Sequence, residues 1–384
     1  MHNSLIRYFL KKSSVFPFLF AVLTLLFPAV HGQTGPGGVG NAAGVGGQPH
    51  NVMWLDAGII DLGNEDPVGE WPDRSGNSFD ASQDIAGRRP VFLQGGSYNI
   101  SLPAVRFSAA GNTFLEYSGN TVVGTDYTIF LVAAKRSAGN QWVMGGTTNS
   151  GANRNLHFGW QSNTAYRYHH WGNDIQNVSL TDGAPGTGVE SYGIMALLND
   201  KSMSDRFLFQ NNLQIRQGAT PADLVSWDGS GLGGTPQLNN YSNIDVAEVI
   251  FYRTGLNTAQ RQIVNQYLNV KYGIAISNDL YNPDPSYVHD VAGIGRAADG
   301  QHTLASSAGF YLSAEEGLAV GDYVFASHNN APNGRGDFSD GGLPAGVEKR
   351  FNRIWSVGRV NSPGATVSFS ISNSAATFFL LPFF

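Results

Sequence analysis

The chain has 384 residues, of which only 14% are charged and 48 are glycine, and it contains no cysteine. This length is sufficient for two domains with a sizeable core each, and the many glycines suit turn-rich β structure. The absence of cysteine excludes disulfides, thiol catalysis, thiolate zinc sites and iron–sulfur clusters. The sequence contains no block of basic residues, which argues against a nucleic-acid partner.

Residues 1–32 have the pattern of a secretory signal peptide. Three basic residues precede an apolar run over residues 15–30, and the small residue Gly32 ends a suitable cleavage site. A transmembrane anchor is the alternative, but the run is shorter than the roughly 20 residues that a span needs, and it contains two prolines. Removal of the signal leaves 20 of the 23 basic residues against all 29 acidic ones, a net charge of −9. We therefore expect a secreted, extracellular protein with no membrane span once the signal is removed.

Residues 33–49 are small, uncharged and Gly-rich, so they are predicted to form a flexible linker. A first domain is predicted over residues 50–273, because short apolar segments there are separated by Gly, Asn, Ser and Asp clusters without a helical pattern. The predicted strands before residue 211 are 52–57, 91–93, 104–107, 114–117, 127–134, 141–145, 155–160, 165–171, 192–198 and 206–210. This pattern predicts an antiparallel two-sheet β-sandwich and argues against an α/β fold.

The stretch 244–273 predicts a buried strand followed by the one capped helix. Its first part is apolar apart from Glu248, as in a strand that is covered on both faces. Asn257 and Gln260 have the spacing of a capping box, and a left-handed Gly273 would end the helix. The helix is predicted to lie between the first domain and the part of the chain that follows.

A second, smaller β-sandwich domain is predicted over residues 274–384. An Asx- and Pro-rich connector covers residues 274–288, after which short apolar segments return. The predicted strands are 291–294, 309–312, 323–327, 351–357 and 366–371. The apolar end over residues 377–384 is unusual for a solvent-exposed terminus, so a C-terminal truncation is expected, with a genuine terminal strand as the alternative.

Two groups of segments resemble known domains. The first domain resembles LamG-like, concanavalin A-like lectin/glucanase domains of secreted bacterial surface proteins through NVMWLDAG (51–58), WPDRSGN (71–77), LPAVRFSAAGNTFLEY (102–117) and AEVIFYRTGLN (247–257). The second resembles an uncharacterised β domain that commonly follows them, through HDVAGIGR (289–296), GDYVFASHNN (321–330) and EKRFNRIWSV (348–357). The resemblance implies the architecture and a cell-surface role, but no catalytic or ligand residues, because the family has no agreed set.

The segment WPDRSGNSFDAS contains a possible calcium loop. Oxygen-bearing side chains at alternate positions suit a hard cation such as Ca²⁺. The candidate ligands are Asp73, Ser75, Asn77 and Asp80. Asp228 is a weaker candidate of the same kind. The alternative is an Asx turn, in which these side chains bond their own backbone; it is favoured because the glycine and the twelfth residue do not match an EF-hand loop.

The segment from 155 to 175 is rich in aromatic residues and predicts two adjacent strands. On a strand, Tyr166, Tyr168 and His170 share one face, whereas Arg167, His169 and Trp171 share the other. One of these faces could stack on sugar rings. The candidate ligand-binding residues are Trp160, Tyr166, Tyr168, His170 and Trp171. The alternative is that the aromatic residues pack in the core, which is their usual role in strands.

The sequence favours a non-enzymatic binding protein. A glycoside hydrolase needs two carboxylates across a cleft, but Glu248 has only apolar neighbours on its strand face, and the adjacent Glu315 and Glu316 would point apart. We therefore expect a secreted, surface-associated binding or adhesion protein whose partner is a glycan or a surface protein. The alternatives are a polysaccharide-degrading enzyme of concanavalin-like fold and a purely structural module.

Overall fold

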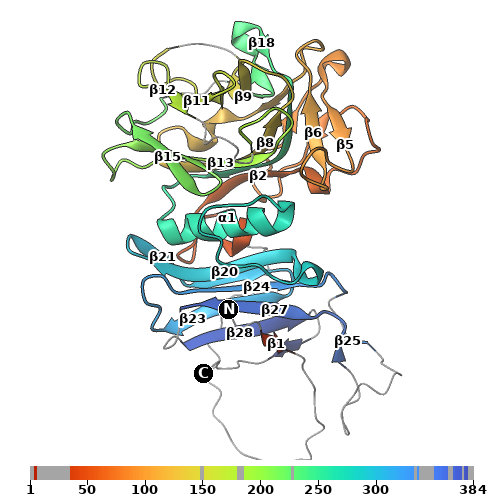
Figure 1. Cartoon of the computed structure of the whole chain (residues 1–384), viewed down its shortest axis with the longest axis vertical. Coiled ribbons are helices and arrows are strands. Elements are labelled where there is room, and N and C mark those ends of the chain that lie inside the picture. Colours follow the sequence, from red (N-terminus) through yellow and green to blue (C-terminus); the bar gives the residue numbers. More distant parts are fainter. Residues whose placement is uncertain are drawn as a thin grey trace, which may run out of the picture.

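The computed structural model describes residues 4–6, 35–147, 151–179, 186–225, 229–332, 335–336, 350–361, 366–373 and 376–378. Over these residues it is an all-β structure with one α-helix, α1 (Thr258–Tyr272). Two β-sandwiches are stacked along the long axis of the molecule, and α1 lies between them (Figure 1). The predicted fold class, with a capped helix between two β-sandwiches, is confirmed.

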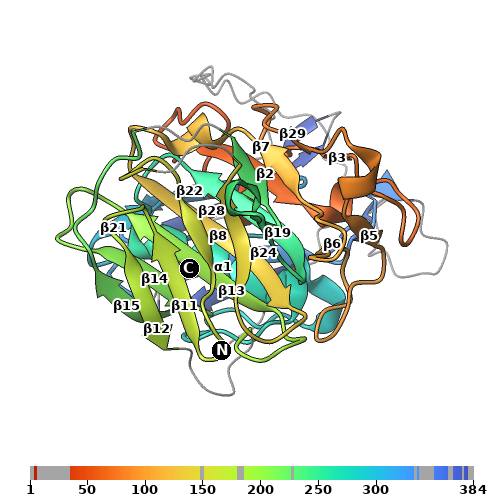
Figure 2. The same ribbon diagram turned by 90° about the horizontal axis from the view of Figure 1, so that it is seen from above.

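The first sandwich consists of two antiparallel sheets, which we call the front sheet and the back sheet. The front sheet has the order β12 (Ile175–Ser179), β11 (Ala165–His169), β10 (His157–Trp160), β9 (Gln141–Gly146), β16 (Ser230–Leu232), β7 (Leu115–Tyr117), β4 (Ala81–Ser82), β3 (Glu70–Trp71). The back sheet has the order β15 (Leu213–Gly218), β14 (Arg206–Gln210), β13 (Gly193–Asn199), β8 (Tyr127–Lys135), β19 (Ile244–Tyr252), β6 (Ala104–Phe107), β5 (Val91–Leu93), and β2 (Asn51–Asp56) also pairs with β19. Seen along the stack, β11, β12 and β15 lie at one end of this sandwich and β5 and β6 at the other (Figure 2).

Shorter elements connect these strands. A two-stranded ribbon is formed by β17 (Gly234–Thr235) and β18 (Asn240–Tyr241). The 3-10 turns are η1 (Pro36–Gly38), η2 (Ala57–Ile59), η3 (Ala86–Arg88), η4 (Gly119–Val122), η5 (Pro236–Leu238) and η6 (Pro285–Tyr287).

The core of the first sandwich lies between the inner faces of its two sheets. The central strands β8 and β19 are buried along their whole length. Phe251 on β19 meets Tyr117 on β7 edge to face, with ring centroids 5.7 Å apart, and Phe158 stacks on Tyr166 at 5.5 Å between neighbouring front strands. Side chains alternate between the two faces along a strand. On the front strands, the neighbours of these core residues therefore lie on the outer face of the front sheet, which points away from the back sheet.

Helix α1 is the middle layer of the molecule. Asn257 caps it by accepting from the Gln260 N–H, Gln260 reaches back to the Asn257 N–H, and Gly273 ends it at φ 67°. Ile263 belongs to an apolar cluster that contains Phe130 from the back sheet and Phe325 from the second sandwich. The helix therefore buries both sides, and the predicted capping box, glycine stop and doubly covered strand are confirmed.

The second sandwich packs against the other side of α1. Its nearer sheet has the order β1 (Ser4–Ile6), β27 (Trp355–Val360), β24 (Tyr323–His328), β20 (His289–Ala297), β21 (Gly300–His302). Its farther sheet has the order β22 (Leu304–Ser307), β23 (Phe310–Glu316), β28 (Thr366–Asn373), β29 (Ala376–Phe378), and β25 (Arg335–Gly336) pairs with β26 (Arg350–Phe351). Phe310 and Phe369 stack in its core at 5.6 Å.

Several predictions fall largely outside the described residues. These are the signal peptide, of which only residues 4–6 are described, and the apolar end, of which residues 379–384 are not. The domain boundaries at residues 49/50 and 273/274 stay predictions. Within the described part of the chain, no helix has both the length and the apolar character needed to cross a membrane.

The predicted flexible linker is wrong for residues 35–39, which we call the strap. The strap is buried between α1 and the second sandwich. Its Gly38 has φ 80°, and a Cβ atom there would lie 2.6 Å from the Ala305 Cβ and 2.9 Å from the Ala292 Cβ. The Val39 carbonyl accepts from the Tyr252 hydroxyl at 3.1 Å. The glycines allow close packing here, whereas their composition alone is the same as that of a mobile linker.

Candidate functional site

The outer face of the front sheet carries a cluster of aromatic and basic side chains. On β11, Tyr166 and Tyr168 point into the core, so Arg167 and His169 point outward. His157 on β10 pairs with His169, and Trp142 on β9 pairs with Gly159, which places both on the same outer face. Trp171 follows β11 in a left-handed conformation, with φ 55°. We call Trp142, His157, Arg167, His169 and Trp171 the outer cluster.

Four of the five candidate ligand-binding residues pack in the core, as the favoured alternative for this segment predicted, so they form no aromatic platform. Trp160, Tyr166, Tyr168 and His170 are all 0% exposed. The alternation of the two faces was predicted correctly, but the face that carries these residues is the one that packs on the back sheet. Trp171 alone of the five joins the outer cluster.

Trp142 lies at the centre of the outer cluster. The Arg167 guanidinium carbon lies 4.1 Å above the centroid of its ring. The rings of His157 and His169 meet it edge to face at 5.6 Å and 5.8 Å. Trp142 is only 4% exposed, although Arg167, His169 and Trp171 around it are half-buried.

The protonation state of His157 follows from its neighbours. Trp171 donates its Nε1–H to His157 Nε2 at 2.8 Å, and the Gly146 N–H points at the same nitrogen at 3.3 Å. Burial lowers the pKa of His157 to about 3, with a further contribution from the charges of His169 and Arg167. The ring is therefore neutral at pH 7 and carries its proton on Nδ1.

Four polar atoms of the outer cluster are buried without a hydrogen-bond partner among the described residues: Trp142 Nε1, His157 Nδ1, Arg167 Nε and His169 Nε2. Buried polar groups in proteins are nearly always paired, so an unpaired group requires an explanation such as a ligand or an ordered water. A concentration of four such atoms around one indole ring singles out this face as a candidate binding site.

A second polar cluster lies behind β11, inside the sandwich. The Tyr127 hydroxyl lies 2.5 Å from both the Tyr168 hydroxyl and His170 Nε2. The Arg206 guanidinium carbon lies 4.6 Å above the Tyr168 ring, and Arg206 donates to the Asn173 carbonyl. Burial raises the pKa of Tyr127 and, together with the Arg206 charge, lowers that of His170. Tyr127 thus pairs the Tyr168 hydroxyl and one nitrogen of His170 inside the core, while His170 Nδ1 and Arg206 Nε and Nη1 have no hydrogen-bond partner among the described residues.

The candidate calcium loop is an Asx turn, which is the alternative that the sequence favoured. Asp73 Oδ1 accepts from the backbone N–H groups of Trp54 and Ser75, both at 2.8 Å, and its Oδ2 accepts from the Ser75 hydroxyl at 2.8 Å. Asp80 Oδ1 accepts from the Asp73 N–H at 2.7 Å, while the Asn77 amide donates to a backbone carbonyl. The carboxylates are thus used to hold the backbone, and no group of three acidic or histidine residues in the described ranges is arranged to hold a metal. Asp228 lies outside the described residues.

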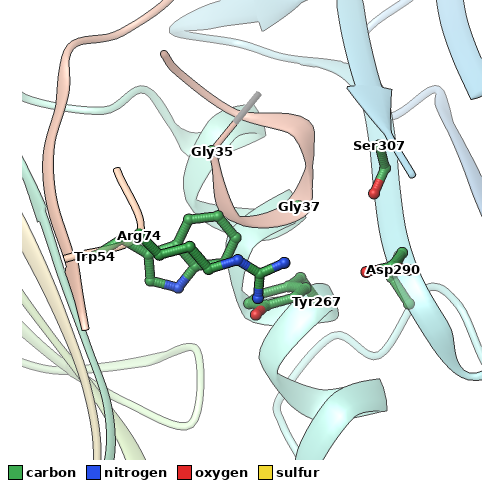
Figure 3. Close-up of a pocket in the computed structure, with 8 residues that line it drawn as sticks. Gly35, Gly37, Trp54, Arg74, Tyr267, Asp290 and Ser307 are labelled. Atoms are coloured by element: carbon green, nitrogen blue, oxygen red, sulfur yellow. The ribbon is translucent and has the colours of Figure 1, made fainter. Parts of the chain in front are cut away.

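This turn positions Arg74 in a small pocket between the two sandwiches (Figure 3). The pocket is lined by Gly35, Gly37, Trp54, Arg74, Tyr267, Asp290, Val291 and Ser307. The Arg74 guanidinium lies 4.4 Å from the Trp54 ring centroid and pairs with Asp56 at 2.8 Å. The pocket has a volume of about 220 Å³ even when open solvent is included, which is smaller than the ~300 Å³ at which small-molecule sites begin.

Arg74 belongs to a buried network of four charges that joins the back sheet to α1. Lys271 Nζ lies 2.8 Å from both Asp56 Oδ2 and Glu248 Oε2. Glu248 Oε1 also accepts from the Tyr267 hydroxyl at 2.9 Å. Two positive and two negative side chains therefore balance one another, which is how buried charges are tolerated.

The pKa values of the network follow from this pairing. Burial alone would raise the pKa of Asp56, but the charges of Lys271 and Arg74 outweigh burial and hold this pKa below its ordinary value. Burial would lower the pKa of Lys271, but Glu248 and Asp56 outweigh it and raise this pKa. Asp56 and Lys271 stay ionised at neutral pH, and the network acts as a structural link between β2, β19 and α1.

No protein-family model and no curated protein match the chain. The structure is similar to several solved structures at low identity. The binding domain of Paraclostridial Mosquitocidal Protein 1 has 12% identity, covers 86% of this chain and 73% of its own, and superposes with a TM-score of 0.43. Domain 4 of the extracellular GH43 arabinanase AbnA from Geobacillus stearothermophilus, in complex with arabinotriose, has 12% identity, covers 56% of this chain and 97% of its own, with a TM-score of 0.40.

A sialidase from Trypanosoma rangeli has 11% identity and covers 57% of this chain, with a TM-score of 0.36. This chain spans about a third of the sialidase's own length, 32%. None of these structures is similar enough to assign an activity or a ligand to this chain. A family is therefore not established by the comparisons, and the LamG-like resemblance stays a prediction.

Proposed function

We propose that this chain is a secreted, cell-surface-associated, non-enzymatic binding protein whose LamG-like first sandwich binds a glycan through the outer cluster. The observation that carries the proposal is the group of unpaired polar atoms around Trp142. An indole ring with polar groups beside it is the usual chemistry of sugar recognition, because the ring packs on the C–H face of the sugar while the polar groups bond its oxygens. Cell-surface association is part of the proposal and follows from the predicted signal peptide.

Binding at this site requires Arg167 to move away from the Trp142 ring. The contact is a cation–π interaction at the protein surface, which is worth about 0.5–1 kcal/mol. Arg167 also donates an exposed hydrogen bond from Nη2 to Asn140 Oδ1 at 2.8 Å. Both contacts are weak enough for a ligand to displace, so the indole face is accessible at little cost.

The chemistry of the outer cluster supports a binding site over a hydrolytic one. Asp174 brings one carboxylate to the cluster, where its Oδ1 accepts from the His170 N–H at 2.8 Å and its Oδ2 lies 4.0 Å from His169 Nδ1. Glycoside hydrolysis uses two carboxylates on opposite sides of the scissile bond. His157 is neutral and buried, so it is suited to hold a ligand oxygen and not to shuttle a proton at pH 7.

The proposal is tested by retention of the full chain on a panel of immobilised neutral and acidic polysaccharides, with reducing ends assayed in the same wells. We expect retention without new reducing ends, and a loss of at least tenfold in affinity for Arg167→Ala, because the displaced guanidinium donates to the bound glycan. Arg216→Ala, which changes an exposed arginine on the edge strand β15, is the matched control and should bind like the wild type. New reducing ends would establish an enzyme instead. Absence of retention on every polysaccharide would contradict glycan binding and favour a structural or protein-binding role.

A further inference from the structure

The outer cluster offers hydrogen-bond donors and few free acceptors, and we infer that it selects sugars that carry a carboxylate. This inference rests on the proposed glycan binding and specifies the chemical class of the ligand. It predicts that acidic polysaccharides bind and that the same polymers without their carboxylates do not.

Three of the four unpaired atoms are donors. Trp142 Nε1 and Arg167 Nε always carry a hydrogen, and His157 Nδ1 carries one because its Nε2 accepts from Trp171. A ligand that satisfies all three must present acceptor oxygens toward the sheet. A carboxylate has two oxygens with about four lone-pair sites and no hydrogen of its own, so it meets this requirement with one group.

Two of the acceptor oxygens near the outer cluster are already used, and Asp174 Oδ2 lies 4.0 Å from His169 Nδ1. Asn140 Oδ1 accepts from Arg167 Nη2 at 2.8 Å, and Asp174 Oδ1 accepts from the His170 N–H at 2.8 Å. A neutral sugar binds through hydroxyl groups, each of which has a hydrogen to donate as well as lone pairs. Its hydroxyl hydrogens would find few partners on this face, and an unpaired donor in an interface weakens binding.

The charge of Arg167 favours the same class of ligand. Arg167 is permanently positive, and its planar guanidinium matches a carboxylate in shape. The chain as a whole is acidic, with a net formal charge of −6, so attraction to a polyanion must come from this local patch.

The N–H donors of Trp142 and His157 are buried. Trp142 is 4% exposed and His157 is 0% exposed, so neither N–H is solvated in the way that a surface donor would be. Arg167 covers the Trp142 ring, and Trp171 meets the His157 ring edge to face at 4.9 Å. A carboxylate that draws Arg167 outward would therefore uncover the indole of Trp142 in the same movement.

The test compares pairs of polymers that differ only in the acidic group. Polygalacturonate, alginate and hyaluronan are each paired with their carboxyl-reduced forms, in which a hydroxymethyl group replaces the carboxylate. Affinities of the full wild-type chain are measured by calorimetry or affinity electrophoresis at 0.05 M and 0.5 M NaCl. We expect at least one acidic polymer to bind at least tenfold more tightly than its reduced form, with most of this preference lost at the higher salt concentration.

Arg167→Gln should remove the preference, whereas Arg216→Gln should keep it. Thermal unfolding of both variants verifies that they are folded. If Arg167→Gln does not fold, the inference is decided by the affinities of the wild-type chain for the acidic and the carboxyl-reduced polymers. Equal affinity for all pairs, or binding of neutral polysaccharides alone, would overturn the inference and leave the proposed function intact. Absence of binding to acidic and neutral polymers alike would overturn both.

Discussion

Trp171 donates its indole N–H to Nε2 of His157 at 2.8 Å, and this one hydrogen bond sets the character of the outer cluster. It leaves the proton of the neutral imidazole on Nδ1, which has no acceptor among the described residues. Trp171, which follows β11 in a left-handed conformation, thus makes the buried His157 on β10 a hydrogen-bond donor through Nδ1. The ligand preference inferred above depends on this conversion.

The first prediction concerns this tautomer. Two-dimensional ¹H–¹⁵N spectra that report imidazole nitrogens should show His157 neutral and protonated on Nδ1 between pH 5 and pH 8. Trp171→Phe removes the donor and leaves a buried nitrogen with one weak partner, so it should destabilise the fold by about 1 kcal/mol. An imidazolium, or a proton on Nε2, in the wild-type protein would contradict the assignment.

The second prediction concerns pH. The pKa of His157 is about 3 in the folded protein and about 6.5 when unfolded, so between these values the unfolded chain binds more protons. The free energy of unfolding should therefore fall as the pH is lowered, by about 2 kcal/mol at pH 5 relative to pH 8. Asp56, whose pKa is lowered, contributes stability that is lost only as the pH falls below its ordinary value near 4, outside this window.

Other buried histidines also lower the free energy of unfolding at acidic pH, since burial lowers the pKa of His302 to about 4. The comparison is therefore between the wild type and His157→Gln, each unfolded by urea at pH 5 and pH 8. The variant should lose about 2 kcal/mol less than the wild type over this range. An identical pH dependence of the two proteins would show that His157 is not held neutral.

The third prediction concerns the charge network between the sandwiches. Lys271→Met removes the cation that lies 2.8 Å from both Asp56 and Glu248. It leaves Asp56 paired with Arg74, and the buried Glu248 with neutral donors such as the Tyr267 hydroxyl. The expected loss is about 3–5 kcal/mol in the free energy of unfolding. Lys201→Met is the control, because Lys201 pairs with Asp223 at 2.6 Å in an exposed position and should contribute less than about 1 kcal/mol. Equal effects of the two substitutions would refute the structural role of the network.

The fourth prediction concerns the strap. Gly38→Ala would place a methyl group 2.6 Å from the Ala305 Cβ in a backbone conformation of φ 80°, so it should cost about 3 kcal/mol or more from strain and overpacking. Gly46→Ala tests the backbone alone, because Gly46 has φ 66° and no atom within 4 Å of the added carbon; it should cost about 1–2 kcal/mol. Similar unfolding free energies for the two variants would mean that the strap is not wedged against the second sandwich.

Local patterns in the sequence predicted much of the fold. The apolar run around Glu248, the capping residues Asn257 and Gln260, and the stop at Gly273 all depend on residues close to one another in the chain, and the structure confirms each. Alternation along residues 165–171 also predicted which side chains share a face. Such features follow from strand and helix periodicity, which a single sequence contains.

The candidate site could not be predicted because it depends on pairing between distant strands. Both faces of β11 carry aromatic or basic residues, so the pattern does not say which face meets the back sheet. Trp142 joins the outer cluster through the register of β9 with β10, which shifts between Phe158 and Gly159. The glycines of the strap and the carboxylates of the Asp73 turn were ambiguous for a similar reason, because close packing and backbone bonding depend on partners elsewhere in the chain.

The most direct test of the central claim is hydrogen–deuterium exchange of the full chain with and without a retained polysaccharide. If the outer cluster binds the glycan, peptides that cover β9 to β11 and Trp171 should exchange more slowly in its presence. Peptides from β15 on the back sheet and from β27 in the second sandwich should be unaffected. Protection confined to α1, the back sheet or the second sandwich, with β9 to β11 unchanged, would contradict the account.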